Sequence, residues 1–269
     1  MSELPEIVVR RTVGLRDIPR VLVAPRQVFA RVEDVRAWGW PLLILLTLVT
    51  LIGYATVETG LIDREVDRGV RARIAELDRT QRDVVERSAL RDLYDNEIKQ
   101  GEFEKLLKRM GVIVAEPLQA LAVALLVAAL LYGVTALTGR KAEWHTLLTI
   151  CVFAGFIDAL RLLVMLALQL YQHTLEVDTS LALLMRWVPA GVGGNATARA
   201  VTASLLTALD PFRVWYWAVV IVGLAASSQL PGWRAWLTCG LCWLAGAATR
   251  CGLAVATLPG VIGGGPPSR

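Results

Sequence analysis

Asp158 and Arg161 are opposite charges one helical turn apart, in the middle of an apolar run. A charged side chain at that depth of a bilayer costs a few kcal/mol, so each needs a partner or a water-filled cavity. Two hypotheses follow. The pair belongs to a polar pathway or proton relay, or its charges neutralise each other and hold this segment against its neighbours. The spacing favours the second hypothesis.

Four more ionisable residues stand inside or at the ends of apolar segments: Glu116, Asp210, Arg213 and Arg250. If all four lie towards the same side of a membrane they can form one polar cluster, but separate contacts with the membrane surface are favoured. Asp210 directly precedes Pro211, which predicts a helix N-cap. Its carboxylate accepts a hydrogen bond from a first-turn amide, and a proline at the first helical position needs no N–H.

Cys239 and Cys242 form a CxxC pair within an apolar segment, and the chain has only two histidines, His145 and His173. A zinc site needs four suitable ligands, so metal binding and redox chemistry are disfavoured and we expect no cofactor. Small residues favour close helix packing there instead; they are Gly240, Ala245, Gly246, Ala247 and Gly252. The sequence has no nucleophilic triad, phosphate-binding loop or metal-binding helix pair. We therefore expect no enzyme activity and no catalytic residues.

The elements that position these residues are long apolar blocks. Hydrophobic residues make up 55% of the 269-residue chain, and about 20 apolar residues in a helix span a bilayer. The sequence therefore predicts an all-α, polytopic helical membrane protein with five transmembrane helices. Their approximate ranges are 40–57, 117–137 (starting at Glu116-Pro117), 145–171, 211–229 and 232–258. The net charge of +4 does not indicate a nucleic-acid partner, because bases and acids alternate between the apolar blocks.

Residues 61–110 separate the first two spans and contain 12 Lys/Arg and 12 Asp/Glu. We expect a charged, helical, extramembrane hairpin here, in which Ser88 starts the second helix and Gly101 interrupts it. An apolar stripe recurs every three to four residues along the first arm; it comprises Ile62, Val66, Val70, Ile74 and Leu77. The stripe packs on the other arm, on a second copy or on a partner, and the first alternative is favoured.

The remaining segments flank these elements. Residues 1–37 contain seven arginines, and Val28 and Phe29 begin an apolar face on a helix that starts at Pro25. Such a helix lies in the membrane interface or packs on the helix bundle, and both alternatives stay open. The irregular segment 172–209 is expected at the membrane surface or partly folded back into the membrane. The predicted parts are the leader 1–37, the first span 38–60, the hairpin 61–110, the bundle of spans two to five 111–259, and a flexible tail 260–269.

Three blocks have the order and spacing of a known family. They are VAPRQVFARVEDVRAWGWPLLILL before and into the first span, LTGRKAEWHTLLTICVFAGF across the turn between the second and third spans, and LDPFRVWYWAVVIVGLA at the start of the fourth. The chain resembles the Yip family of Ypt/Rab-interacting membrane proteins, in its bacterial branch. Charge counting leaves the orientation open. The resemblance implies a multi-pass protein of the bacterial inner membrane with a cytoplasmic leader and a periplasmic C-terminus. The hairpin and the Asp158–Arg161 pair have no counterpart in the family pattern.

The resemblance implies no agreed biochemical activity, and some bacterial members occur alongside export-type ABC transporters. We expect a non-enzymatic accessory or scaffold subunit of a larger bacterial membrane assembly, such as an export-type ABC transporter. Its expected partners are other membrane proteins and lipids, bound by the hairpin, the leader helix and the loop after the third span. The alternative is a small permease or lipid-handling transporter that uses Asp158, Arg161 and Arg250. A membrane redox protein that uses Cys239 and Cys242 is a third possibility.

Overall fold

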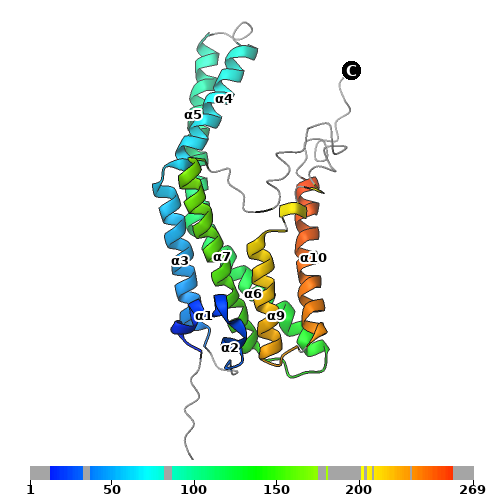
Figure 1. Cartoon of the computed structure of the whole chain (residues 1–269). Coiled ribbons are helices and arrows are strands. Elements are labelled where there is room, and N and C mark those ends of the chain that lie inside the picture. The colour runs from blue at the N-terminus through cyan, green and yellow to red at the C-terminus, as the bar shows by residue number, and fades with distance from the viewer. Residues whose placement is uncertain are drawn as a thin grey trace, which may run out of the picture. The chain divides into compact units, whose positions relative to one another are not determined.

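The computed structural model describes residues 13–32, 37–81, 87–174, 180, 201–202, 205–207, 209–230 and 232–256. Helices make up most of these residues, and no strand occurs among them (Figure 1). The prediction of an all-α chain is confirmed for this part. The tail 260–269 and most of the segment 172–209 lie outside the described residues.

Three helices are long and apolar enough to cross a membrane within the described part of the chain. They are α3 (Gly39–Glu58), a continuous helix over Ser88–Leu137 that ends with α6 (Glu116–Leu137), and α7 (Trp144–Gln172). Two further apolar helices follow: α9 (Pro211–Ala226), which has 16 residues, and α10 (Trp233–Ala256). The chain therefore has the helices of a membrane protein, while the count of five spans stays a prediction.

The chain divides into two compact units. The first unit comprises Met1–Leu45, Ala122–Asp158 and Asp178–Arg269. The second unit comprises Leu46–Leu121 and Ala159–Val177. The boundary falls within α3, α6 and α7, so each of these long helices contributes to both units.

The core of the first unit surrounds the N-terminal half of α7. Every side chain from Thr146 to Ala154 is buried. This segment is apolar nearly all round, which is the pattern of a helix with neighbours on every side. Both α2 and α10 pack on α9 in the same unit. Buried side chains from the other helices complete this core; they are Val21, Val28, Phe29, Ala128, Leu131, Val220 and Leu224.

The leader forms three short helical pieces in the first unit. A 3-10 turn (Leu15–Asp17) leads into α1 (Ile18–Val23), and α2 (Pro25–Phe29) follows after one residue. Val28 and Phe29 are buried in the core of the first unit. Of the two alternatives that the sequence leaves open, this burial supports a leader helix packed on the bundle.

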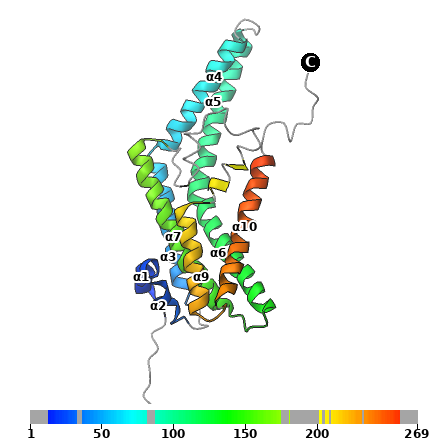
Figure 2. The ribbon, with the colours of Figure 1, turned by 45° about the vertical axis from the view of Figure 1, so that its right-hand side comes forward.

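In the second unit, α4 (Leu61–Gln81) and α5 (Arg87–Met110) lie along each other (Figures 1 and 2). We call these two helices the α4–α5 pair. Three residues of the apolar stripe of α4 are buried, Ile62, Val66 and Val70, while Ile74 and Leu77 are half-buried. The stripe therefore packs within its own chain, which is the alternative that the sequence favours.

The prediction that Gly101 interrupts the second helix is wrong. Gly101 is buried within α5, and a Cβ added to it would lie 2.5 Å from Val70 Cγ2 on α4. A glycine has no Cβ, so it permits a close approach of two helices. Gly53 on α3 has a similar place, since its added Cβ would lie 2.6 Å from the Val112 carbonyl oxygen. Both glycines mark close crossings.

A single π-helical turn, Gly111–Ala115, joins α5 to α6. The N–H of Glu116 bonds to the carbonyl of Gly111, five residues back. The wider turn suits Pro117, which has no N–H and whose ring would clash with the carbonyl four residues before it. The prediction that a helix starts at Glu116-Pro117 is therefore wrong, because one continuous helix runs from Ser88 to Leu137 and α6 has no free N-terminal end.

Candidate functional site

Four residues from the three sequence blocks meet in the core of the first unit, and we call them the block junction: Phe29, Ile150, Phe153 and Gly223. The ring of Phe29 stands edge-on to that of Phe153, with 6.4 Å between ring centres and 89° between ring planes. A Cβ added to Gly223 would lie 2.7 Å from Ile150 Cγ2 and 3.2 Å from Phe29 Cδ2. The missing side chain at Gly223 therefore sets how closely α9 approaches α7 and α2.

Polar side chains connect two turns of the first unit. Gln229 accepts a hydrogen bond from the Glu143 N–H at 3.2 Å and donates one to Glu143 Oε2 at 3.0 Å. Thr146 donates to the same carboxylate oxygen at 3.0 Å, and Arg140 donates to the Ser228 carbonyl at 3.0 Å. We call these five residues the turn clamp. It fixes the turn between α6 and α7 against the turn between α9 and α10.

Trp38, directly before α3, is bonded to His145 at the start of α7. The indole Nε1–H donates to His145 Nδ1 at 3.2 Å. A nitrogen that accepts carries no proton, so the neutral imidazole with its proton on Nε2 fits this contact. The bond joins the first sequence block to the second.

Asp17 connects the two ends of the described part of the leader, residues 13–32. Its buried carboxylate accepts from the Gly14 N–H at 3.0 Å and from Arg31 Nη2 at 2.8 Å. Burial alone would raise the pKa of Asp17, but the Gly14 N–H and the Arg31 guanidinium outweigh it and lower the pKa. The folded leader therefore stabilises the ionised form of the Asp17 carboxylate.

Asp210 is buried and caps α9, since its carboxylate accepts from the N–H of Phe212 at 2.9 Å. The predicted N-cap is confirmed, with a proline at the first helical position. Arg213 on α9, Arg250 on α10 and Asp158 on α7 belong to the same unit and are half-buried. Each of these three makes a polar or electrostatic interaction.

Glu116 and Arg161 belong to the second unit and are half-buried. The two side chains lie within electrostatic reach of each other. The sequence does not predict this relationship, since it pairs Arg161 with Asp158 and places Glu116 in the four-residue polar cluster. That pair and that cluster stay predictions.

Four free thiols occur in the chain: Cys151 and Cys239 are buried, and Cys242 and Cys251 are half-buried. Among the described residues, no group of three or more His, Cys, Asp or Glu side chains is placed to hold a metal ion. Cys239 packs in the core of the first unit. The hydroxyl of Tyr216 is buried there as well, without a hydrogen-bond partner in the described part of the chain.

The α4–α5 pair presents an exposed apolar surface. Phe103, Leu106, Leu107 and Met110 are each more than half exposed, with Phe103 at 61%, and we call them the α5 stripe. At helical spacing this stripe lies on the side of α5 away from Gly101, the residue that packs on α4. The intervals of three and four residues are visible in the sequence, although only the α4 stripe was predicted from them.

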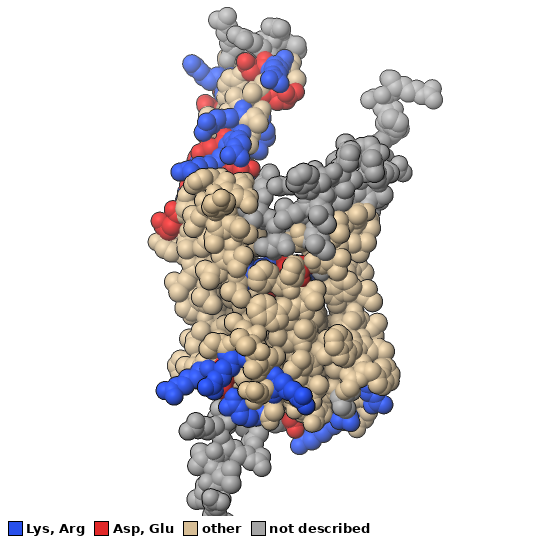
Figure 3. Space-filling model, in the orientation of Figure 1, with Lys and Arg blue, Asp and Glu red and all other residues tan. Residues whose placement is uncertain are grey.

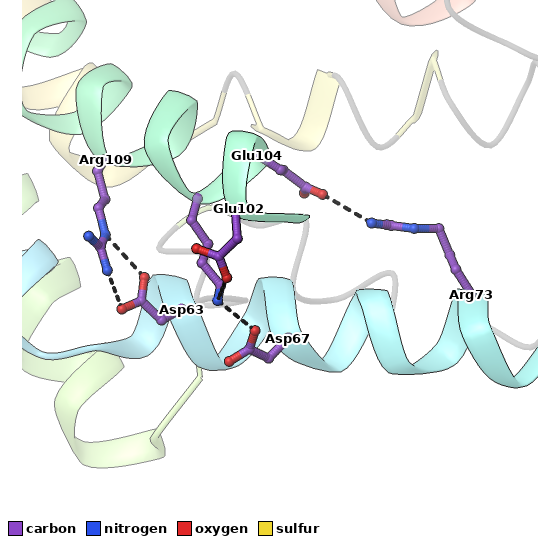
Figure 4. A network of polar contacts seen from close by, with 7 residues as sticks. Asp63, Asp67, Arg73, Glu102, Glu104 and Arg109 are labelled. Atoms are coloured by element: carbon purple, nitrogen blue, oxygen red, sulfur yellow. Dashed lines mark hydrogen bonds and ion pairs between the residues drawn. The ribbon is translucent and has the colours of Figure 1, made fainter. Parts of the chain in front are cut away.

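Charged side chains surround the α5 stripe, and both signs alternate over the pair (Figure 3). Ion pairs between the two helices are drawn in Figure 4; they are Asp63–Arg109, Asp67–Lys105 and Arg73–Glu104. Exposed pairs of this kind contribute little to stability because water screens them. A surface hollow adjoins the stripe, lined by Arg73, Lys99, Gln100, Phe103, Glu104 and Leu107. Water solvates the charged side chains of this surface well, whereas exposure of the apolar α5 stripe to water is unfavourable.

A family model described as the Yip1 domain matches residues 20–249. The match covers the block junction, the turn clamp and the α4–α5 pair. No curated protein and no solved structure matches the chain.

Proposed function

The chain belongs to the Yip1 domain family, and we propose that it acts without catalysis as an accessory or scaffold subunit of a larger bacterial membrane assembly. The family is the one that the three sequence blocks predict. An assembly of membrane proteins, an export-type ABC transporter among the candidates, is the proposed setting. A scaffold subunit acts by binding other proteins. Its functional surfaces are therefore the exposed surfaces that such a partner can bind.

The α5 stripe is the observation that carries this proposal. Its side chains are exposed in the most charged segment of the chain, where the neighbouring side chains are charged and hydrated. Complete burial of one such side chain contributes about 1.5–3 kcal/mol, and covering the half that is still exposed contributes about half of that. Exposed apolar patches on otherwise polar surfaces mark interaction sites. A helix of a partner subunit that lies along α5 is the proposed occupant.

The proposed topology has five spans, α3, α6, α7, α9 and α10, with the α4–α5 pair outside the membrane. With a rise of about 1.5 Å per residue, the 16 residues of α9 extend about 24 Å. The hydrocarbon layer measures about 30 Å. The turn residues Ser227–Leu230 could supply the missing length of this fourth span, or a locally thinner bilayer could remove the need for it.

The proposed orientation places the leader in the cytoplasm of a bacterial inner membrane and the C-terminus in the periplasm. Cations dominate the leader and the short turns of the first unit among the described residues; they are Arg16, Arg20, Arg26, Arg31, Arg140, Lys141 and Arg234. The acids among the described residues of these segments are Asp17 and Glu143, and the leader sequence adds Glu3, Glu6, Glu33 and Asp34. Residues 61–110 contain equal numbers of acids and bases. The rule that bases favour the cytoplasmic side counts Lys and Arg whatever acids lie beside them, so the 12 bases of residues 61–110 compete with the leader and the proposed orientation rests on the family resemblance.

Site-specific photocrosslinking in native membranes tests the scaffold role. A photoreactive amino acid at Leu107 should give an adduct with a membrane protein that also co-purifies in mild detergent. The same probe at Arg71, an exposed residue of α4, should give little adduct. A Leu106→Ser/Leu107→Ser variant should lose the co-purifying protein while its thermal unfolding stays unchanged, because neither side chain is part of the folded core.

Two results would contradict the scaffold role. One is a monodisperse chain that purifies alone from native membranes. The other is an adduct of equal strength at Leu107 and Arg71, since this would indicate random collisions and not a bound partner.

The alternative, a small permease or lipid-handling transporter, is favoured by ionisable side chains on apolar helices. Asp158 and Arg161 on α7 and Arg250 on α10 are half-buried, and such residues commonly mark transport pathways. An Asp158→Asn variant that folds normally but loses transport of a labelled substrate would support this alternative. A variant that fails to insert would indicate a structural charge pair instead.

A further inference from the structure

The exposed side of the leader combines arginines with bare apolar side chains. Arg16, Arg20 and Arg26 are exposed, while the opposite side of the same segment enters the core. Two apolar side chains of the same segment are exposed as well, Leu15 at 50% and Val23 at 87%. We call these five residues the arginine face. It is amphipathic on its outer side, in addition to the apolar side that packs on the bundle.

Among the described residues of the leader, a single acid stands against the arginine face, and it is shared with Arg31. Asp17 is the only acid among residues 13–32, and its carboxylate is buried and bonded to Arg31. Arg20 lies 3.6 Å from that carboxylate, yet its side chain stays 68% exposed. Three exposed guanidinium groups therefore share one buried carboxylate, which leaves a net positive charge on this part of the leader. The face is therefore suited to an external anion.

Tryptophans show at what level of the membrane the arginine face lies. The turn clamp and the Trp38–His145 bond bring the starts of α3, α7 and α10 to one end of the first unit. Trp40 on α3 and Trp233 and Trp236 on α10 are largely exposed near these starts. Exposed tryptophans favour the interface between membrane and water. Figure 3 shows Lys and Arg gathered around α1 and α2 at this end.

From these observations we propose that the arginine face binds the anionic phospholipid headgroups of the bilayer around the chain. Guanidinium groups donate paired hydrogen bonds to phosphate oxygens. Leu15 and Val23 enter the apolar layer just below the headgroups. An acidic protein segment would satisfy the arginines but would leave an exposed valine and leucine at a membrane surface. The lipid surface accounts for both kinds of side chain.

The test uses the full chain in nanodiscs of phosphatidylcholine mixed with a smaller share of phosphatidylglycerol. The lipids that stay bound after extraction in mild detergent are counted by native mass spectrometry. The unaltered chain should retain phosphatidylglycerol in preference to phosphatidylcholine. Each arginine near an anionic surface corresponds to about a fivefold change in affinity. An Arg16→Gln/Arg20→Gln/Arg26→Gln variant should therefore lose the preference.

Two matched variants separate this effect from net charge and from folding. Arg64→Gln/Arg68→Gln/Arg71→Gln removes three exposed arginines from α4 and should keep the preference for phosphatidylglycerol. The Arg16→Lys/Arg20→Lys/Arg26→Lys variant should keep most of it, because the charges remain. Arg31 stays unaltered in each variant, since it holds Asp17. Equal losses in the α4 variant, or an undiminished preference in the first Gln variant, would overturn the proposal.

The depth of Val23 distinguishes a lipid surface from other anions. A fluorescent amino acid at Val23 should be quenched by brominated lipids, and more strongly in discs that contain phosphatidylglycerol. Inorganic phosphate should not displace the retained lipid. Two results together would assign the face to an acidic protein and refute a lipid site. The chain in pure phosphatidylcholine discs would bind soluble polyglutamate, and the chain from the mixed discs would retain no phosphatidylglycerol.

Discussion

Gly223 on α9 lies so close to Ile150 on α7 that a methyl group has no room: an added Cβ would stand 2.7 Å from Ile150 Cγ2. Phe29 of the leader closes another side of the same contact at 3.2 Å. Three segments that are far apart in the sequence thus meet at a residue without a side chain. The block junction makes the leader part of the membrane bundle.

Gly223→Ala should therefore destabilise the first unit. The new methyl group forces Ile150 or Phe29 to move, and overpacking of this kind costs about 1–3 kcal/mol. Thermal unfolding in detergent, followed by tryptophan fluorescence, measures the change.

Gly240→Ala on α10 is the matched control. A Cβ added to Gly240 meets nothing within 4 Å among the described residues, and alanine is the better helix former by about 1 kcal/mol. This variant should unfold at the same temperature as the unaltered chain or at a higher one. Equal losses of stability in the two variants would mean that the close contact with Ile150 and Phe29 is not the reason why a glycine is needed at position 223.

Features that depend on neighbouring residues could be predicted from the sequence. The N-cap at Asp210 requires only the acid, the proline after it and the N–H of Phe212 two residues on. The apolar blocks likewise predict membrane helices, because the length of a span is set within one segment. The family follows from three such local blocks, and its model matches the chain.

Features that depend on distant residues could not be predicted. Trp38 and His145 lie 107 positions apart, and Glu143 and Gln229 lie 86 apart. The local sequence predicts a helix interruption at Gly101, because a glycine weakens an isolated helix. Its role depends on Val70 of the other helix, which the local sequence does not reveal.

Gly101→Ala should separate α4 from α5, because the new methyl group meets Val70 at 2.5 Å. Overpacking again costs about 1–3 kcal/mol. Hydrogen exchange of residues 61–81 and 88–110 should speed up in this variant. A Gly101→Ala/Val70→Ala double variant should recover part of the protection, since it returns the space that the methyl group takes. No recovery would mean that the two side chains do not compete for that space.

Asp17→Asn should loosen the leader at neutral pH. The neutral amide loses the charge-assisted bond to Arg31, which contributes about 1.5–3 kcal/mol. Hydrogen exchange of residues 13–32 should speed up, with little change elsewhere. Gln27→Ala, an exposed side chain of the same segment, should leave the exchange rates unaltered.

The stability that Asp17 provides should also depend on pH. Its folded-state pKa is lowered, below an unfolded value of about 3.9. Its contribution is therefore fully present above the unfolded value and is lost as the pH falls through the folded one. Protection of residues 13–32 should fall in acid in the unaltered chain and not in Asp17→Asn. The same fall in both chains would show that another group is responsible.

Gln229→Leu should weaken the turn clamp. Leucine has no hydrogen-bonding group, so it leaves the Glu143 N–H without its acceptor and Glu143 Oε2 without one of its donors. An unsatisfied group at such a site costs about 1–3 kcal/mol. The midpoint of thermal unfolding should fall accordingly, and α9 and α10 should exchange faster where they approach this turn.

Ser228→Gly, in the same turn, should stabilise the folded chain, whereas Gln229→Leu destabilises it. Ser228 has a φ of 59°, a conformation that costs a residue with a side chain about 1–2 kcal/mol and costs glycine much less. Arg140 bonds to the backbone carbonyl at this position, so the substitution leaves that contact in place. The Ser228→Gly variant should unfold at an equal or higher temperature. If both variants lost stability equally, the turn would be sensitive to any change, and the specific role of the Glu143–Gln229 contact would be wrong.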